Sequence, residues 1–103
     1  MKVGRNKKVA SSLDALAEKN RLGIVLCLAD GEKCVCDIFK HLKLPQNLVS
    51  HHLSVLRQIG LIKNRKDGKR VYYCLNEKKI KELTDFFNDI DCCCLRHAKK
   101  DKK

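Results

Sequence analysis

Hydrophobic positions recur with helical spacing along most of this chain, most clearly in the range Pro45–Ile62. There Val49, Leu53 and Leu56 fall at i, i+4 and i+7, on one side of an amphipathic helix. The opposite side carries short, uncharged polar residues, where a helix facing only water would usually carry Lys and Glu. Such side chains can hydrogen-bond to base edges in a DNA major groove. The candidate base contacts are Gln46, Asn47, Ser50, His51 and Ser54.

Three further helices are predicted before this one. Ser11 or Ser12 can cap a first helix, and the mostly apolar range Arg21–Leu28 predicts a second, buried helix. The range Val35–Leu42 predicts a short third helix, and a tight connection leads from it to Pro45. Two helices joined by so few residues, the second with a polar outer face, match a helix-turn-helix.

Two short stretches after the helix-turn-helix predict a β-hairpin. Leu61–Asn64 and Arg70–Leu75 have the composition of strands, and Asp67-Gly68 between them is a strong turn signal. A basic hairpin that follows a recognition helix is a wing, which contacts phosphates or the minor groove. The alternative is a solvated turn rich in Lys. The candidate phosphate contacts are Arg65, Lys66, Lys69 and Arg70.

The last helix is predicted from Ile80, Leu83, Phe87 and Ile90. Its apolar face is long for a terminal helix, so we expect the first and last helices to form a dimer seam. The expected fold is mainly α with a small β-hairpin: a winged helix-turn-helix that dimerises through its first and last helices. We divide the chain into a basic flexible arm (1–10), the winged helix-turn-helix domain (11–91) and a basic tail containing Cys (92–103).

Composition supports a polyanionic partner. The 103 residues suffice for one domain, and 23 Lys and Arg against 12 acidic residues give a net charge of +11. Nucleic acid is the first candidate partner and an anionic membrane the second, with a generically basic protein as the alternative. No apolar run is long enough to span a membrane, and the N-terminus does not look like a secretory signal. We therefore expect a cytoplasmic protein with reduced thiols.

Seven cysteines are the second informative feature. Cys34 and Cys36 lie two apart, so on a regular helix their side chains point about 200° away from each other. Both can bind one ion only if the start of the helix is distorted, and a pair of thiolates would select a soft ion. The alternative is two incidental thiols. Additional sulfurs are available from Cys92, Cys93 and Cys94, within one subunit or across a dimer, unless these form only an oxidation-prone tail.

These motifs together resemble the ArsR/SmtB family of winged-helix metal-sensing repressors. The resemblance runs from Leu13 to Leu75 and lies in LDALAEKNRLGIVLCLADGE, KCVCDI, LVSHHLSVLRQIGLI and DGKRVYYCL. It implies a homodimer that represses its operon from double-stranded operator DNA until an inducing ion lowers its DNA affinity. KCVCDI is similar to the thiol site of the arsenic- and antimony-responsive members and of the cadmium/lead sensors. The implied inducers are As(III) or Sb(III), then Cd(II) or Pb(II), with Zn as a further candidate.

The chain departs from the family's patterns in three places. Phe39 stands where the arsenic sensors have a third Cys, and no Cys precedes Cys27, where the cadmium/lead type supplies thiols from an N-terminal extension. Near the last helix Asp85, Asp89 and Asp91 occur without the His pair of the zinc/nickel type. The third ligand is therefore left to the cluster at residues 92–94.

Other function classes compete with the metal sensor. A thiol redox switch would release DNA on oxidation without metal, and a winged-helix module of another kind would contact protein rather than DNA. An enzyme is poorly supported, because the sequence has no glycine-rich phosphate loop, paired carboxylates in an apolar setting or evident nucleophile–base constellation.

Overall fold

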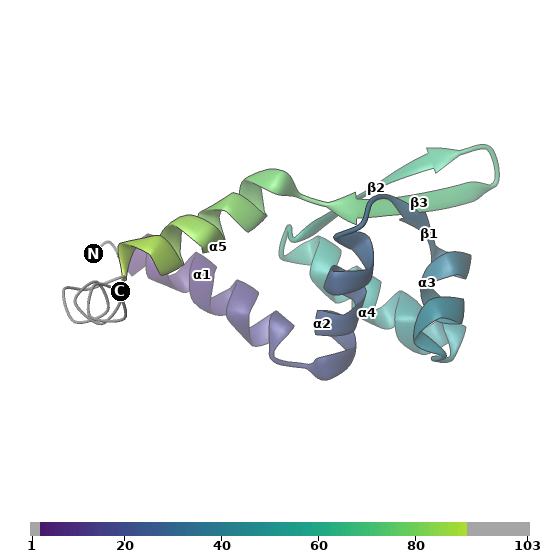
Figure 1. The fold of residues 1–103 in the computed structure, drawn as a ribbon, viewed down its shortest axis with the longest axis horizontal. Coiled ribbons are helices and arrows are strands. Elements are labelled where there is room, and N and C mark those ends of the chain that lie inside the picture. The colour runs from purple at the N-terminus through teal and green to yellow at the C-terminus, as the bar shows by residue number, and fades with distance from the viewer. Residues whose placement is uncertain (1–2, 91–103) are drawn as a thin grey trace, which may run out of the picture.

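Helices dominate the part of the chain that the structure describes. A computed structural model describes residues 3–90, with residues 3–6 by their backbone alone. Figure 1 shows α1 and α5 side by side at one end of the molecule, with α3, α4 and the β2–β3 hairpin at the other. No helix within these residues is long and apolar enough to cross a membrane. The elements are α1 (Val3–Leu16), α2 (Lys19–Leu28), β1 (Lys33–Cys34), α3 (Val35–Leu42), α4 (Gln46–Gln58), β2 (Ile62–Asp67), β3 (Arg70–Leu75) and α5 (Glu77–Asp89).

The predicted helix-turn-helix is formed by α3 and α4. The turn between them depends on Lys43, which adopts a left-handed backbone with φ of 57° and caps α3 by donating its backbone N–H to Phe39 O. Leu44 N also donates to Phe39 O, at 3.3 Å. Ile38 of α3 and Val49 of α4 are fully buried in the same core. The turn and this shared core fix the angle between α3 and α4.

The wing is a β-hairpin, to which a third strand is added. Strands β2 and β3 pair antiparallel around a turn at Gly68, whose φ is 63°. Strand β1 pairs antiparallel with the other edge of β3, so that Cys34 lies opposite Tyr72 and the order is β1-β3-β2. The sequence predicted the hairpin but not β1, because a strand of two residues shows no alternation of polar and apolar side chains.

Asn76 fixes the base of the wing. Its side-chain Nδ2 donates to Gly60 O at 2.9 Å, and its backbone N donates to Leu61 O, also at 2.9 Å. Gly60 has φ of 84°, a conformation that glycine adopts without steric cost, and it lets the chain turn from α4 into β2. The end of α4, the hairpin and the start of α5 are therefore tied together at one point.

Three predictions about the first half of the chain differ from the structure. Helix α1 begins at Val3, so residues 3–10, which we predicted as a flexible arm, are helical. Ser12 is buried inside this helix and donates to Lys8 O rather than capping the helix start. Helix α2 is not buried on all sides, since Leu22 and Leu26 are 43% and 64% exposed. Local sequence does not show that α1 is stabilised by packing against α5, which is distant in the chain.

Candidate nucleic-acid interface and thiol site

Helix α4 presents its polar side to solvent. Its buried residues are Val49, His52, Leu53 and Leu56, which hold the helix against the core. The opposite face is free, and every side chain predicted there to contact bases is exposed: Gln46, Asn47, Ser50, His51 and Ser54. Arg57, three residues after Ser54, is also exposed and extends this face with a charge that the sequence reasoning did not single out. The geometry is that of a recognition helix with one side anchored and the other available.

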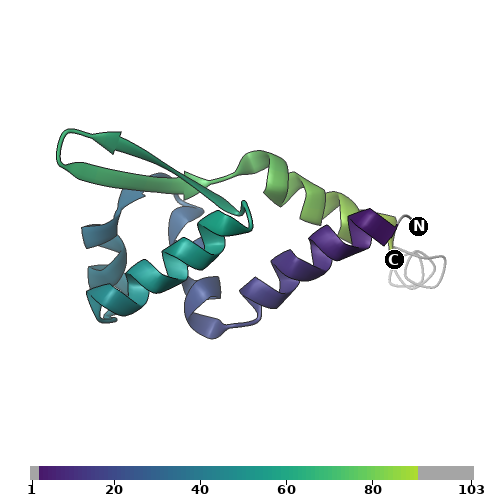
Figure 2. The ribbon, with the colours of Figure 1, turned by 180° about the vertical axis from the view of Figure 1, so that it is seen from behind.

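The hairpin extends beyond the body of the protein near α4, as Figure 2 shows from the opposite side. All four predicted phosphate contacts are exposed on it: Arg65, Lys66, Lys69 and Arg70. A helix and a neighbouring basic hairpin can contact a major groove and the flanking backbone together. The structure thus brings the two predicted halves of a DNA-binding surface into one part of the molecule.

Arg65 is already engaged within the chain. Its Nε lies 2.7 Å from Glu32 Oε2, and its Nη2 lies 2.8 Å from Glu32 Oε1. The guanidinium carbon also lies 4.8 Å from the centroid of the Tyr72 ring. The hydrogen bonds to Arg65 lower the pKa of Glu32, and the same bonds raise the pKa of Arg65. Neither Glu32 nor Tyr72 was singled out from the sequence, because no local pattern relates residues 33 positions apart.

Arg70 connects the wing electrostatically to the thiols. A hydrogen bond with Tyr72 is the main cause that raises the pKa of Arg70, and electrostatic interactions with Tyr72, Cys34 and Cys36 add to it when these groups are ionised. The antiparallel register places Arg70 close to the thiol segment. Tyr72 lies opposite Cys34, and Arg70 lies on the same strand as Tyr72, two residues before it. A cation of the wing therefore lies near both thiols of the predicted sensor segment.

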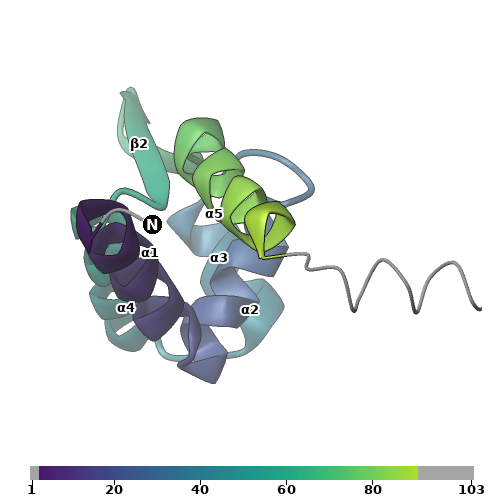
Figure 3. The same ribbon diagram turned by 90° about the vertical axis from the view of Figure 1, so that its left-hand side faces the viewer.

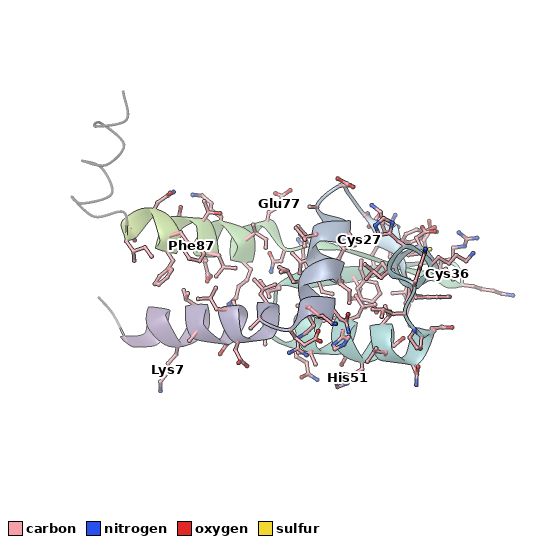
Figure 4. The ribbon with its side chains drawn as sticks, turned by 60° about the horizontal axis from the view of Figure 1, so that its bottom comes forward. Lys7, Cys27, Cys36, His51, Glu77 and Phe87 are labelled. Carbon is pink, nitrogen blue, oxygen red and sulfur yellow. The ribbon has the colours of Figure 1, made fainter. Side chains whose placement is uncertain are left out.

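Cys34 and Cys36 lie at the junction of β1 and α3. Cys34 ends the strand, occupies the N-cap of α3 in an extended conformation and is 4% exposed. Its Sγ donates to Asp37 Oδ2 at 3.2 Å. Cys36 lies in the first turn of α3 and is exposed (Figure 4). The two thiols thus have different environments, and α3 is regular from Val35 onward.

The described residues do not complete a metal site around these thiols. Within residues 3–90 no group of three or more His, Cys, Asp or Glu side chains is placed to hold one ion. The predicted additional ligands Cys92, Cys93 and Cys94 lie outside the described residues. Helix α5, which precedes them, ends at the opposite end of the molecule from α3 (Figure 1).

The histidines of α4 have separate environments. His51 is exposed, whereas His52 is 5% exposed and packs toward the start of α2. Arg21 Nη1 lies 3.5 Å from His52 Nδ1, and Glu18 Oε1 lies 3.8 Å from His52 Nε2. Glu18 also caps α2 by accepting from Arg21 N at 2.9 Å. His52 is therefore a buried residue and does not belong to the exposed face.

Comparison with known proteins agrees with this geometry. Residues 18–64 match the family described as "Bacterial regulatory protein, arsR family". The chain is 35% identical over 85 residues to an uncharacterized HTH-type transcriptional regulator of Methanocaldococcus jannaschii, covering 82% of this chain and 96% of that protein. It is 50% identical over 62 residues to the arsenical resistance operon repressor of Escherichia coli, covering 59% of this chain and 53% of that repressor.

A solved structure extends the comparison to the fold. The homodimeric winged helix-turn-helix DNA-binding domain Mb0332 from Mycobacterium bovis, a possible ArsR-family transcriptional regulator, has a TM-score of 0.69 and 30% identity, covering 82% of this chain and 80% of that one. The match to the family covers the helix-turn-helix and the start of the wing, where the exposed polar helix and the two thiols lie. The chain belongs to the ArsR family of winged helix-turn-helix transcriptional regulators, which are DNA-binding proteins and not enzymes.

Proposed function

We propose that this chain is a homodimeric repressor that releases operator DNA when Cys34 and Cys36 bind a soft, thiophilic ion. Arsenite and antimonite are the first candidates, because the Escherichia coli relative with 50% identity is an arsenical resistance operon repressor. Cd(II) and Pb(II) come next, since thiolates also select these ions. One observation carries the proposal: the two cysteines flank the junction through which the wing sheet continues into the helix-turn-helix.

On the DNA side, α4 would lie in the major groove with its five exposed polar residues toward the bases. Its amide and hydroxyl groups match the donors and acceptors there. The wing would contact the phosphate backbone through Lys66, Lys69 and Arg70, which are exposed. The high net charge of +11 supports a binding reaction dominated by phosphate contacts.

On the sensor side, the two thiols can act together only after a change at the start of α3. Cys34 is buried and hydrogen-bonded to Asp37, whereas Cys36, two residues later, is exposed. Bringing both sulfurs to one centre breaks the Cys34–Asp37 hydrogen bond and distorts the first turn of α3. Because only residues 43–45 join α3 to α4, this distortion is transmitted to the recognition helix. Allosteric coupling of this kind is typically about 1–3 kcal/mol, which corresponds to a 5–150-fold change in affinity.

A dimer would place two recognition helices, one from each subunit, on one operator. The surfaces of α1 and α5 leave Leu13, Phe87 and Ile90 substantially exposed, which supports a seam there. Helix α5 ends at the opposite end of the molecule from β1 and α3, which carry Cys34 and Cys36 (Figure 1). We therefore propose that any sulfur that residues 92–94 add to the site comes from the partner subunit.

The test is ion-induced release of an operator selected from a pool of random duplexes. In a reducing buffer, arsenite should weaken operator binding by the wild-type dimer about 5–150-fold. Cys34→Ser and Cys36→Ser should abolish this response while leaving DNA affinity without arsenite within about twofold. Cys74→Ser, a thiol on β3 outside the sensor segment, is the matched control and should respond like wild type.

Other outcomes discriminate between the alternatives. Release by an oxidant alone, with no response to arsenite, antimonite, cadmium or lead, would replace the ion sensor by a redox switch. Substitution of Cys92, Cys93 and Cys94 by Ser tests the third ligand. Loss of the arsenite response would assign the tail to the site, and full retention would leave two protein thiols and an external ligand.

A further inference from the structure

The carboxylate of Glu32 binds the guanidinium of Arg65 in the way that a DNA phosphate would. Glu32 accepts two parallel N–H···O bonds from it, at 2.7 and 2.8 Å. Two oxygens of a DNA phosphate would accept the same pair of bonds, because carboxylate and phosphate match the planar fork of Arg alike. The Arg65 side chain is nevertheless 53% exposed, so it lies at a surface that a DNA backbone can reach.

The pair is specific within the wing. Asp67, the other carboxylate near Arg65, has its Oδ2 3.8 Å from Nη1 and forms one long contact. Among residues 3–90 no carboxylate is paired with Lys66 or Lys69 on the same hairpin. One basic side chain of the wing is thus occupied by an internal anion, and its neighbours are available.

The pair also joins the wing to the thiol segment. Tyr72 lies opposite Arg65 on one side and opposite Cys34 on the other, in the register of the three-stranded sheet. The Tyr72 ring lies under the guanidinium, at 4.8 Å from its carbon. Glu32 precedes Cys34 by two residues. The contacts therefore form a closed ring, in which a shift of β1 changes the reach of Glu32 toward Arg65.

We propose that Glu32 competes with DNA phosphate for Arg65, and that the wing gains this phosphate contact only when Glu32 releases the guanidinium. The inference rests on the proposed function, because it requires that the wing contacts DNA. It adds a second route from the sensor segment to DNA, through the hairpin, beside the route through α3 and α4. The position of β1 sets how readily Glu32 releases its partner.

The experiment measures binding of the full-length protein to a mixed-sequence duplex over about 50–200 mM salt, a range in which phosphate contacts dominate. Glu32→Gln keeps the side-chain shape but removes the charge that holds Arg65. Asp67→Asn is the matched control, since it removes one carboxylate from the same hairpin without breaking the paired hydrogen bonds. Both variants lose one negative charge, so the difference between them isolates the release of Arg65.

We expect Glu32→Gln to bind the duplex about 5-fold or more tightly than Asp67→Asn at low salt. The slope of log K against log salt should also be steeper by about 0.9, the value for one added phosphate contact. In an Arg65→Gln background this difference should disappear. Glu32→Ala provides a second route to the same release and should behave like Glu32→Gln.

Three results would overturn the inference. Equal affinities and slopes for Glu32→Gln and Asp67→Asn would show that Glu32 does not compete, while leaving the proposed function intact. Weaker binding by both Glu32 variants would show that the pair supports the wing for DNA instead of withholding Arg65. Absence of duplex binding by the wild-type protein would overturn the proposed function and the inference together.

Discussion

His52 links the recognition helix to the start of α2 through a single buried ring. Since Arg21 can only donate, its approach to Nδ1 assigns the imidazole proton to Nε2. Nε2 has no hydrogen-bond partner within residues 3–90, and the nearest carboxylate oxygen, Glu18 Oε1, lies 3.8 Å away. Burial lowers the pKa of His52, with smaller contributions from Arg21 and His51, while Glu18 opposes the shift. The ring is therefore held neutral in the folded protein.

This environment predicts a loss of stability in weak acid. The unfolded chain binds a proton at His52 below about pH 6.5, the ordinary histidine value, more readily than the folded protein does. The contribution to stability is thus complete above that pH and is lost as the pH falls through the folded-state pKa. Over about one pH unit below 6.5 the loss is at most about 1.4 kcal/mol.

Urea unfolding at about pH 7.5 and about pH 5.5, at one fixed protein concentration, measures this loss. His52→Gln should reduce the change in unfolding free energy between the two pH values. His51→Gln, a variant of the exposed neighbouring histidine, should keep the wild-type change. The same pH dependence in wild type and His52→Gln would contradict the assignment.

At the scale of elements, the turn of the helix-turn-helix contains a residue in a costly conformation. Lys43 has φ of 57°, in the left-handed region that Gly adopts freely and other L-residues adopt at a cost of roughly 1–2 kcal/mol. It holds the C-cap of α3, where Gly is the preferred residue. The sequence thus carries a strained residue between the segment with the thiols and the recognition helix.

Lys43→Gly should raise the free energy of unfolding by about 0.5–1 kcal/mol, because the relief of strain exceeds the added entropy of the unfolded chain. Lys40→Gly is the control: it removes the same side chain from an exposed position inside α3 and should lower stability by about 1 kcal/mol. Chemical denaturation of both variants gives the comparison. Destabilisation by Lys43→Gly would mean that the Lys43 side chain contributes more than its backbone costs.

Elements were predicted best where the pattern is local and long. The helix over Val35–Leu42 has the bounds that the sequence predicted. Its apolar spacing and the short loop to Pro45 that follows it are both local signals. The strands were predicted from the turn at Asp67-Gly68, although β2 continues beyond Asn64 to Asp67. The start of α1 and the strand β1 were missed, because both depend on partners distant in sequence: α5 in one case and β3 in the other.

At the scale of the whole molecule, α1 and α5 form an end that the rest of the domain does not cover. Figure 3 views this end, with α1 and α5 in front of the other elements. Leu83 of α5 is buried in the core, together with Val9 of α1. Phe87 and Ile90 of α5 remain 51% and 45% exposed, and they need a second surface to be buried. The proposed dimer supplies that surface.

Phe87→Glu should therefore weaken the dimer by about 2–4 kcal/mol, the effect typical of a buried aromatic anchor at an interface. Sedimentation equilibrium over a range of protein concentrations measures the change. Leu26→Glu is the control, since it introduces the same charge at a more exposed apolar residue on α2. If Leu26→Glu weakened the dimer as much as Phe87→Glu does, the result would contradict a dimer seam formed by α5.

The sequence alone determined the order of helices and strands, the polar face of α4, the basic hairpin and the family, because each is written in residues close together in the chain. Only the tertiary structure decided which of these side chains are free to act. It placed Arg65 in the fork of Glu32, Arg70 near the two thiols and His52 against Arg21. Such pairings follow from strand register and helix packing between distant segments, which periodicity in one segment does not specify.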